Sequence, residues 1–165
     1  MKQTRHLLIA LALGTMLTSC GASVSTATVT GPAAYVDPYI GSGGHGHVFV
    51  GASVPFGAIQ AGPQNIHKGW DWCSGYHHSD SIVIGFAHTH LSGTGCTDMG
   101  DVQIMPYTGE LRSKRGRQED IGGSCSSYYS HDNESVSPGY YSLKMDNGVR
   151  IEMTASTRTA LHRIT

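Results

Sequence analysis

Short apolar runs of strand length are the main pattern along this chain of 165 residues. Apolar and polar residues alternate over 141–145 and again over 149–153, with Asp146-Asn147-Gly148 between the two runs. An Asn-Gly pair between alternating runs is a strong local signal for a turn that joins antiparallel strands. These residues therefore predict a β-hairpin.

Three further runs predict strands. Residues 82–86 are apolar throughout, which suits a strand buried on both faces, 102–105 alternates until Pro106, and 160–164 resembles a strand without a following partner. No segment keeps apolar residues at helical spacing for three turns. The predicted fold class is mostly β, an antiparallel β-sandwich that is incomplete here, so we expect the front part of a longer protein.

The N-terminus has the composition of an export signal. A short basic start precedes the apolar run 7–13, and Leu17-Thr18-Ser19-Cys20 resembles a bacterial lipobox. We therefore expect a signal peptide at 1–19, a lipid on Cys20, a flexible tether at 20–34 and a folded domain at 35–165. The protein would be exported and anchored to a bacterial membrane, facing the periplasm or the cell surface. The alternative is an ordinary signal peptide with an incidental cysteine.

The charge balance excludes one class of partner. Lys and Arg number 11 against 12 Asp and Glu, so no excess of positive charge is present to neutralise phosphates. We expect no nucleic-acid binding.

Candidate chemistry is concentrated in residues 41–100, which hold 13 of the 22 glycines and seven of the ten histidines. Trp70-Asp71-Trp72 combines two indoles with a carboxylate, and in an extended stretch both indoles would point the same way. Indole faces stack on sugar rings while carboxylates and imidazoles bind hydroxyls, so this segment indicates a sugar site. The alternative is that one or both tryptophans belong to the core.

Two other interpretations concern the histidines and the cysteines. The pairs His45/His47 and His88/His90 suit a zinc hydrolase, although neither a His-Glu-x-x-His motif nor a paired-cysteine spacing accompanies them. Outside the cytoplasm a disulfide is permitted, and Cys73 with Cys96 is the pairing that we would test first.

Several stretches together resemble the opening of the glycoside hydrolase family 92 α-mannosidases, in order from about residue 35 to residue 165. They are Tyr35-Val36-Asp37-Pro38-Tyr39-Ile40-Gly41-Ser42-Gly43-Gly44-His45-Gly46-His47, Gly51-Ala52-Ser53-Val54-Pro55-Phe56-Gly57, Trp70-Asp71-Trp72-Cys73-Ser74-Gly75-Tyr76-His77, Gly85-Phe86-Ala87-His88-Thr89-His90-Leu91-Ser92-Gly93-Thr94-Gly95-Cys96, Ser130-His131-Asp132-Asn133-Glu134 and Pro138-Gly139-Tyr140-Tyr141-Ser142.

The resemblance implies an exo-acting, inverting, calcium-dependent α-mannosidase that removes terminal mannose from N-glycans or mannans, with α-1,2 linkages as the expected ones. It also implies two domains, an N-terminal β-sandwich and a C-terminal (α/α)6 barrel with the active site between them. The acid, the base and most calcium ligands are expected from the barrel, which this chain lacks. We therefore expect no catalytic residue here, and no activity from these 165 residues alone.

The same resemblance implies which residues line the pocket. Trp72 is the first choice for stacking against the leaving-group side of the substrate, with Asp71 beside it. The candidates for hydroxyl contacts or for hydrogen bonds at the domain interface are His88, His90, Asp101 and His47, the last in a loop shared with His45. The competing hypothesis is a surface lipoprotein that binds glycans without cleaving them.

Overall fold

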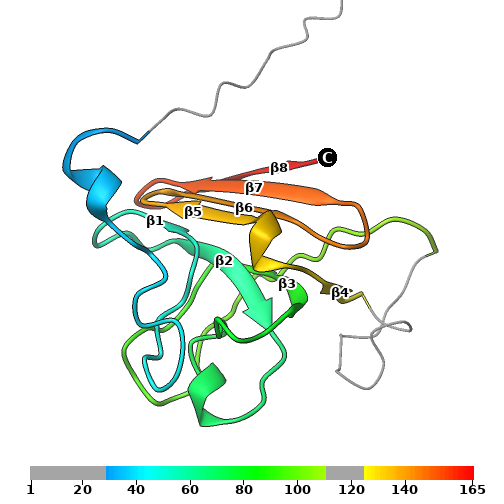
Figure 1. Ribbon diagram of the computed structural model, residues 1–165, viewed down its shortest axis with the longest axis horizontal. Coiled ribbons are helices and arrows are strands. Elements are labelled where there is room, and N and C mark those ends of the chain that lie inside the picture. The colour runs from blue at the N-terminus through cyan, green and yellow to red at the C-terminus, as the bar shows by residue number, and fades with distance from the viewer. Residues whose placement is uncertain (1–28, 111–124) are drawn as a thin grey trace, which may run out of the picture.

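The structure, a computed structural model, describes residues 29–110 and 125–165 of the chain. Within these ranges the chain forms two four-stranded antiparallel sheets packed face to face (Figure 1). The helical elements described there are three short 3₁₀ turns: η1 (Gly31–Tyr35), η2 (Trp70–Trp72) and η4 (His131–Asn133). The predicted β-sandwich is therefore confirmed.

Each sheet is built from strands that are neighbours in sequence. The first sheet has the order β1 (Ala52–Ser53), β2 (Gln60–Asn65), β3 (Ile82–Ala87) and β4 (Ser127–Tyr128). The second sheet has the order β5 (Glu134–Ser137), β6 (Tyr140–Lys144), β7 (Arg150–Ala155) and β8 (Ala160–Ile164). In Figure 1 the second sheet lies above the first, with β8 as its outermost strand.

The predicted hairpin is β6 and β7. The Met145 N–H donates to the Val149 carbonyl at 2.9 Å, and the Gly148 N–H donates to the Met145 carbonyl at 3.0 Å. Three residues therefore form the loop, and the last of them, Gly148, has φ of 89°. Glycine adopts this left-handed conformation without the steric cost of a Cβ, which explains the turn at this position.

Two of the other predicted strands are also confirmed, and one is wrong. The apolar run at 82–86 lies in β3, and 160–164 is β8. The segment 102–105 forms no strand, since only Ile104 pairs there, with Phe86, in an isolated bridge. Val102 has φ of 51°, which interrupts an extended backbone, and its side chain is exposed.

The core lies between the two sheets, where β1 and β2 pack against β6 and β7. Alternate residues of β6 and β7 point inward, so Leu143 and Ile151 face each other across the hairpin and are fully buried. The buried cluster consists of Val50, Ala52, Ala61, Tyr76, Val83, Phe86, Tyr129, Tyr141, Leu143, Met145, Val149, Ile151 and Met153. The sandwich therefore closes on one apolar layer, as the alternation predicts.

A buried carboxylate joins the two halves of the sandwich. The Glu134 side chain has no exposed surface and accepts hydrogen bonds from Tyr141 on β6 (2.7 Å), from Tyr76 in the loop before β3 (3.0 Å) and from His131 Nδ1 (2.7 Å). Burial, together with the neighbouring carboxylate, raises the pKa of both tyrosines, so both hydroxyls keep their protons and donate. We call this group the Glu134 junction.

The N-terminal predictions fall mostly outside the described residues. The signal peptide at 1–19, the lipid-bearing Cys20 and the tether up to residue 28 lie there. The end of the predicted tether overlaps η1. Of the helices in the described part, none has the length and apolarity needed to cross a bilayer.

Candidate functional site

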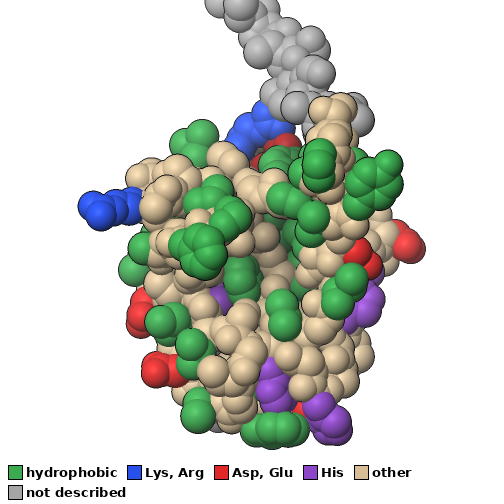
Figure 2. All heavy atoms as spheres, turned by 90° about the vertical axis from the view of Figure 1, so that its left-hand side faces the viewer, with side chains coloured by type: hydrophobic (Ala, Val, Ile, Leu, Met, Phe, Trp, Pro, Cys, Tyr) green, Lys and Arg blue, Asp and Glu red, His purple; other side chains and the backbone are tan. Residues whose placement is uncertain are grey.

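Loops that connect the strands of the first sheet gather at the end away from the second sheet (Figure 1). Histidine side chains appear at the same lower end in the space-filling view, next to apolar and acidic ones (Figure 2). Three segments contact one another here: residues 41–47, which we call the site loop, the η2 turn, and residues 91–97.

Four side chains from the site loop and η2 form one group, which we call the Asp71 cluster: His45, His47, Trp70 and Asp71. His45 Nδ1 lies 2.5 Å from Asp71 Oδ1, and because a carboxylate only accepts, the imidazole donates. His47 Nε2 lies 3.6 Å from the same oxygen. The His47 ring meets the Trp70 ring edge-on, with centroids 4.2 Å apart.

The site loop has a backbone that few residue types permit. His47 has φ of 55°, a left-handed conformation that is uncommon outside glycine, and its carbonyl accepts the Gly93 N–H at 2.7 Å. A Cβ on Gly46 would overlap the carbonyl of Gly41, so the loop closes only with glycine there. Local strain of this kind is often found at functional sites.

The η2 turn directs the two tryptophan side chains to different partners, so the expectation that both indoles point the same way is wrong. The Trp72 N–H donates to the Gly69 carbonyl at 3.0 Å, which closes a 3₁₀ turn where we expected an extended stretch. Trp70 is 58% exposed and lies in the Asp71 cluster. Trp72 instead stacks on His77, and its Nε1 donates to Asp80 at 2.9 Å.

Residues 91–97 close the cluster from a third side. A Cβ on Gly95 would overlap the Trp70 indole, so this backbone lies directly against the ring. The buried Cys73 thiol donates to the Thr94 carbonyl at 2.9 Å, and Cys96 is exposed. Both cysteines are free thiols in the structure, and the Cys73 thiol contacts a backbone carbonyl, so the Cys73–Cys96 disulfide stays a prediction.

Three other candidates have their contacts elsewhere. His88 Nδ1 lies 2.6 Å from the Val102 carbonyl, and its Nε2 lies 2.9 Å from Nε2 of His162 on β8. His90 is buried, stacks on Phe49 and binds the Gln60 carbonyl through Nδ1. The backbone N–H of Asp101 donates a hydrogen bond to the Thr89 hydroxyl oxygen at 3.0 Å. Of the residues predicted for the pocket, the structure therefore brings together Asp71 and His47.

The electrostatics of the cluster favour an ionised carboxylate. The hydrogen bond from His45 is the main cause that lowers the pKa of Asp71 below its ordinary value. A general acid of a glycosidase needs the opposite shift, and an inverting enzyme needs two carboxyl groups about 6.5–9.5 Å apart. Asp71 therefore suits the binding of sugar hydroxyls, and it does not have the properties of a general acid.

The donor set does not fit the metals considered above. Within 29–110 and 125–165 no group of three or more His, Cys, Asp or Glu side chains could hold a metal ion, so the zinc interpretation gains no support. Calcium prefers six to eight oxygen ligands, whereas the cluster offers two imidazoles and a single carboxylate. These residues do not fit calcium.

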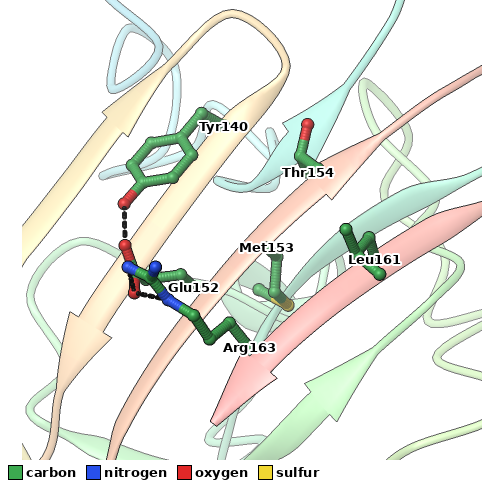
Figure 3. Close-up of a pocket in the computed structure, with 6 residues that line it drawn as sticks. All are labelled: Tyr140, Glu152, Met153, Thr154, Leu161 and Arg163. Carbon is green, nitrogen blue, oxygen red and sulfur yellow. Dashed lines mark hydrogen bonds and ion pairs between the residues drawn. The ribbon is translucent and has the colours of Figure 1, made fainter. Parts of the chain in front are cut away.

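A shallow pocket of about 220 Å³ lies on β6, β7 and β8, away from the cluster (Figure 3). Its polar groups already bind one another, since Glu152 accepts hydrogen bonds from Tyr140 at 2.7 Å and from Arg163 Nε at 2.6 Å. Burial alone would raise the pKa of Glu152, but these donors lower it below its ordinary value. The pocket thus leaves few polar atoms free for a ligand.

A β-sandwich whose loops present an exposed indole beside an ionised carboxylate has the features of a carbohydrate-active protein. Residues 35–165 match the Glycosyl hydrolase family 92 N-terminal domain, which is most of the chain. The chain therefore belongs to glycoside hydrolase family 92, and the resemblance noted in the sequence is confirmed.

Individual relatives agree with this assignment. A family GH92 α-mannosidase of Bacteroides thetaiotaomicron, solved in complex with mannoimidazole, is 42% identical with a TM-score of 0.77, covering 81% of this chain and 18% of that one. A protein of Arthroderma benhamiae called an uncharacterized secreted glycosidase is 32% identical in an alignment of 137 residues that covers 78% of this chain and 16% of that protein.

A GH92 inverting mannosidase of Bacteroides thetaiotaomicron shares the fold, with a TM-score of 0.60 at 24% identity over 83% of this chain and 18% of that one. The chain thus spans less than a fifth of the length of these relatives.

Proposed function

We propose that this chain is the N-terminal domain of an exo-acting, inverting α-mannosidase, in which the Asp71 cluster forms one wall of the sugar pocket. Family membership supports the activity, and the relative solved in complex with mannoimidazole supports a mannoside as substrate. Terminal mannose of N-glycans or mannans is the proposed substrate, with α-1,2 as the proposed linkage.

The observation that carries the proposal is the exposed Trp70 beside Asp71. Trp70 is 58% exposed, so its indole can stack on the apolar face of a pyranose, and an ionised carboxylate next to it can accept hydrogen bonds from sugar hydroxyls. Trp72 was the first choice from the sequence, but its indole N–H is bound to Asp80 and it stacks on His77. We therefore assign the stacking role to Trp70.

The general acid, the general base and the calcium site are proposed to lie in the (α/α)6 domain, outside this chain. His88, His90 and Asp101 are proposed to support the pocket or the domain interface, because their contacts are to the backbone or to residues outside the Asp71 cluster. Activity is then expected only when both domains are present.

Export is proposed because a relative is a secreted glycosidase. Cys20 is the proposed site of lipidation, since it closes a lipobox-like sequence. Cys20→Ala in the native host should move the protein from the membrane fraction to the soluble fraction. Unchanged membrane association in that variant would contradict lipid anchoring through this cysteine.

The direct test is Trp70→Ala in the protein expressed from its complete gene. We expect kcat/KM for α-1,2-mannobioside to fall by about fivefold to thirtyfold, because the loss of one aromatic contact of about 1–2 kcal/mol corresponds to that range. Tyr35→Ala removes another aromatic side chain, 92% exposed, from outside the cluster and serves as the matched control.

An unchanged kcat/KM in Trp70→Ala would contradict the placement of the pocket. Saturable mannoside binding without mannose release by the wild-type protein would favour the glycan-binding alternative.

A further inference from the structure

The site loop is attached to the segment that precedes β3 by two hydrogen bonds. The His78 N–H donates to the Ser42 carbonyl at 2.8 Å. His77 Nε2 lies 3.2 Å from the Gly44 carbonyl, and because a carbonyl only accepts, this nitrogen must carry the proton. Gly44 immediately precedes His45, so the position of the imidazole that binds Asp71 depends on this attachment.

The surroundings of His77 fix both its tautomer and its orientation. The Ser79 N–H lies 3.3 Å from Nδ1, so Nδ1 is the acceptor and the neutral ring carries its proton on Nε2, toward Gly44. The ring is buried and stacks on Trp72, with centroids 4.3 Å apart and an interplanar angle of 23°. His77 therefore has one orientation, and Trp72 supports it.

Trp72 is held in turn by a fully buried carboxylate. Asp80 Oδ2 accepts the indole N–H at 2.9 Å and lies 3.0 Å from Lys68 Nζ. The other oxygen of Asp80 accepts the backbone N–H groups of Ser81 and Ile82, at 2.8 and 3.1 Å. A buried carboxylate with four donors is costly to displace, so the start of β3 provides a fixed point for Trp72.

We propose that Asp80, Trp72 and His77 are positioning residues that hold the site loop in the geometry of the Asp71 cluster. The inference rests on the proposed function, because it concerns the same sugar-binding wall. Trp72 then contributes by orienting His77 and makes no contact with the sugar. External support of this kind also explains how His47 keeps its left-handed backbone.

The test compares His77→Ala with His77→Gln in the protein expressed from its complete gene. The glutamine amide can still donate to the Gly44 carbonyl, whereas alanine cannot. We expect amide hydrogen exchange in residues 41–47 to accelerate about fivefold in His77→Ala, the factor for one lost hydrogen bond, and to return toward wild type in His77→Gln. Trp72→Phe keeps the stacked ring, loses the bond to Asp80, and should show a smaller acceleration.

Kinetics separate this inference from the proposed function. We expect His77→Ala to raise KM for α-1,2-mannobioside more than it lowers kcat, with rescue in His77→Gln. Unchanged exchange in 41–47, or equal impairment in the alanine and glutamine variants, would overturn the positioning role. If exchange responds to His77→Ala while Trp70→Ala and His77→Ala both leave KM unchanged, the positioning role stands and the sugar-binding proposal fails.

Discussion

The two halves of this sandwich are ordered by different interactions. In the second sheet, β5 to β8 pair residue by residue, and the inward-facing apolar residues of β6 and β7 are buried in the core. In the first half, β1 and β4 have two residues each, and all four described non-glycine residues with a left-handed backbone lie there: His47, Phe56, Met99 and Val102. Side-chain hydrogen bonds and close glycine contacts fix the loops of that half.

This difference has a functional meaning. A backbone ladder tolerates exchange of its outward side chains, whereas a loop held by individual side chains and glycines loses its shape when one of them changes. Substitutions in the second sheet should therefore change stability and leave the site intact in the folded molecules. Substitutions in the first half should change the site at a smaller cost in stability.

The largest effect on stability is expected from Leu143→Ala. This fully buried side chain lies in β6, and its truncation leaves a cavity that should lower the free energy of unfolding by about 3 kcal/mol. Denaturant unfolding of the complete protein measures the change, with the exposed neighbour Lys144→Ala as the control. A raised KM in the folded fraction of Leu143→Ala would contradict the separation of the two halves.

A smaller loss of stability with a larger functional effect is expected from Gly46→Ala. The added methyl group would overlap the Gly41 carbonyl and push the site loop away from Asp71, at a cost of about 2 kcal/mol. Gly43→Ala is the matched control, because its Cβ would meet the His78 Cβ at an ordinary 3.7 Å. We expect a raised KM for α-1,2-mannobioside in Gly46→Ala alone, and equal behaviour of the two variants would contradict the close-packed loop.

The smallest effect is a pH dependence carried by His90. Burial lowers the pKa of His90 below its ordinary 6.5, although the Gln60 and Pro63 carbonyls partly oppose this, and His88 lowers it further. Below about pH 6.5 the unfolded chain therefore binds a proton that the folded chain does not. The free energy of unfolding should decrease as the pH is lowered, by at most about 1.4 kcal/mol per pH unit. This decrease ends once the pH passes below the pKa in the folded state.

Replacement of His90 by Asn keeps a donor for the Gln60 carbonyl and removes the titration. The His90→Asn protein should lose stability less steeply between pH 6.5 and pH 5 than the wild type, as followed by thermal unfolding at each pH. Parallel curves for the two proteins would show that the acid sensitivity arises elsewhere.

The sequence predicts those strands that have a clear pattern of apolar residues. The hairpin of β6 and β7 follows from alternating residues and from Asn147-Gly148, because a strand with one buried face must alternate. The strand β3 follows from a continuous apolar run, which suits a strand buried on both faces, and β8 follows from the run at 160–164. The strand β2 escapes prediction, since Gly62 and Pro63 lie inside it and its order comes from pairing with β3.

The site was predicted in part. The family resemblance suggested Asp71 and His47, which lie together in the structure, whereas the proposal of Trp70 in place of Trp72 depends on a 3₁₀ turn and on a buried partner eight residues from Trp72, Asp80. Neither the turn nor the partner has a periodic signature in the sequence. The two indoles, two residues apart, differ in exposure, and exposure is a property of the folded chain.

The Glu134 junction has a consequence for cooperativity. One carboxylate binds hydroxyl groups from both halves, Tyr76 near the site and Tyr141 on β6, so separating the halves would strand three buried polar groups at once. A partly unfolded intermediate with one half intact would therefore be sparsely populated. The irregular, loop-rich half should therefore be as resistant to unfolding as the regular sheet. The slowest-exchanging amides of both halves should exchange with solvent through the same global unfolding event.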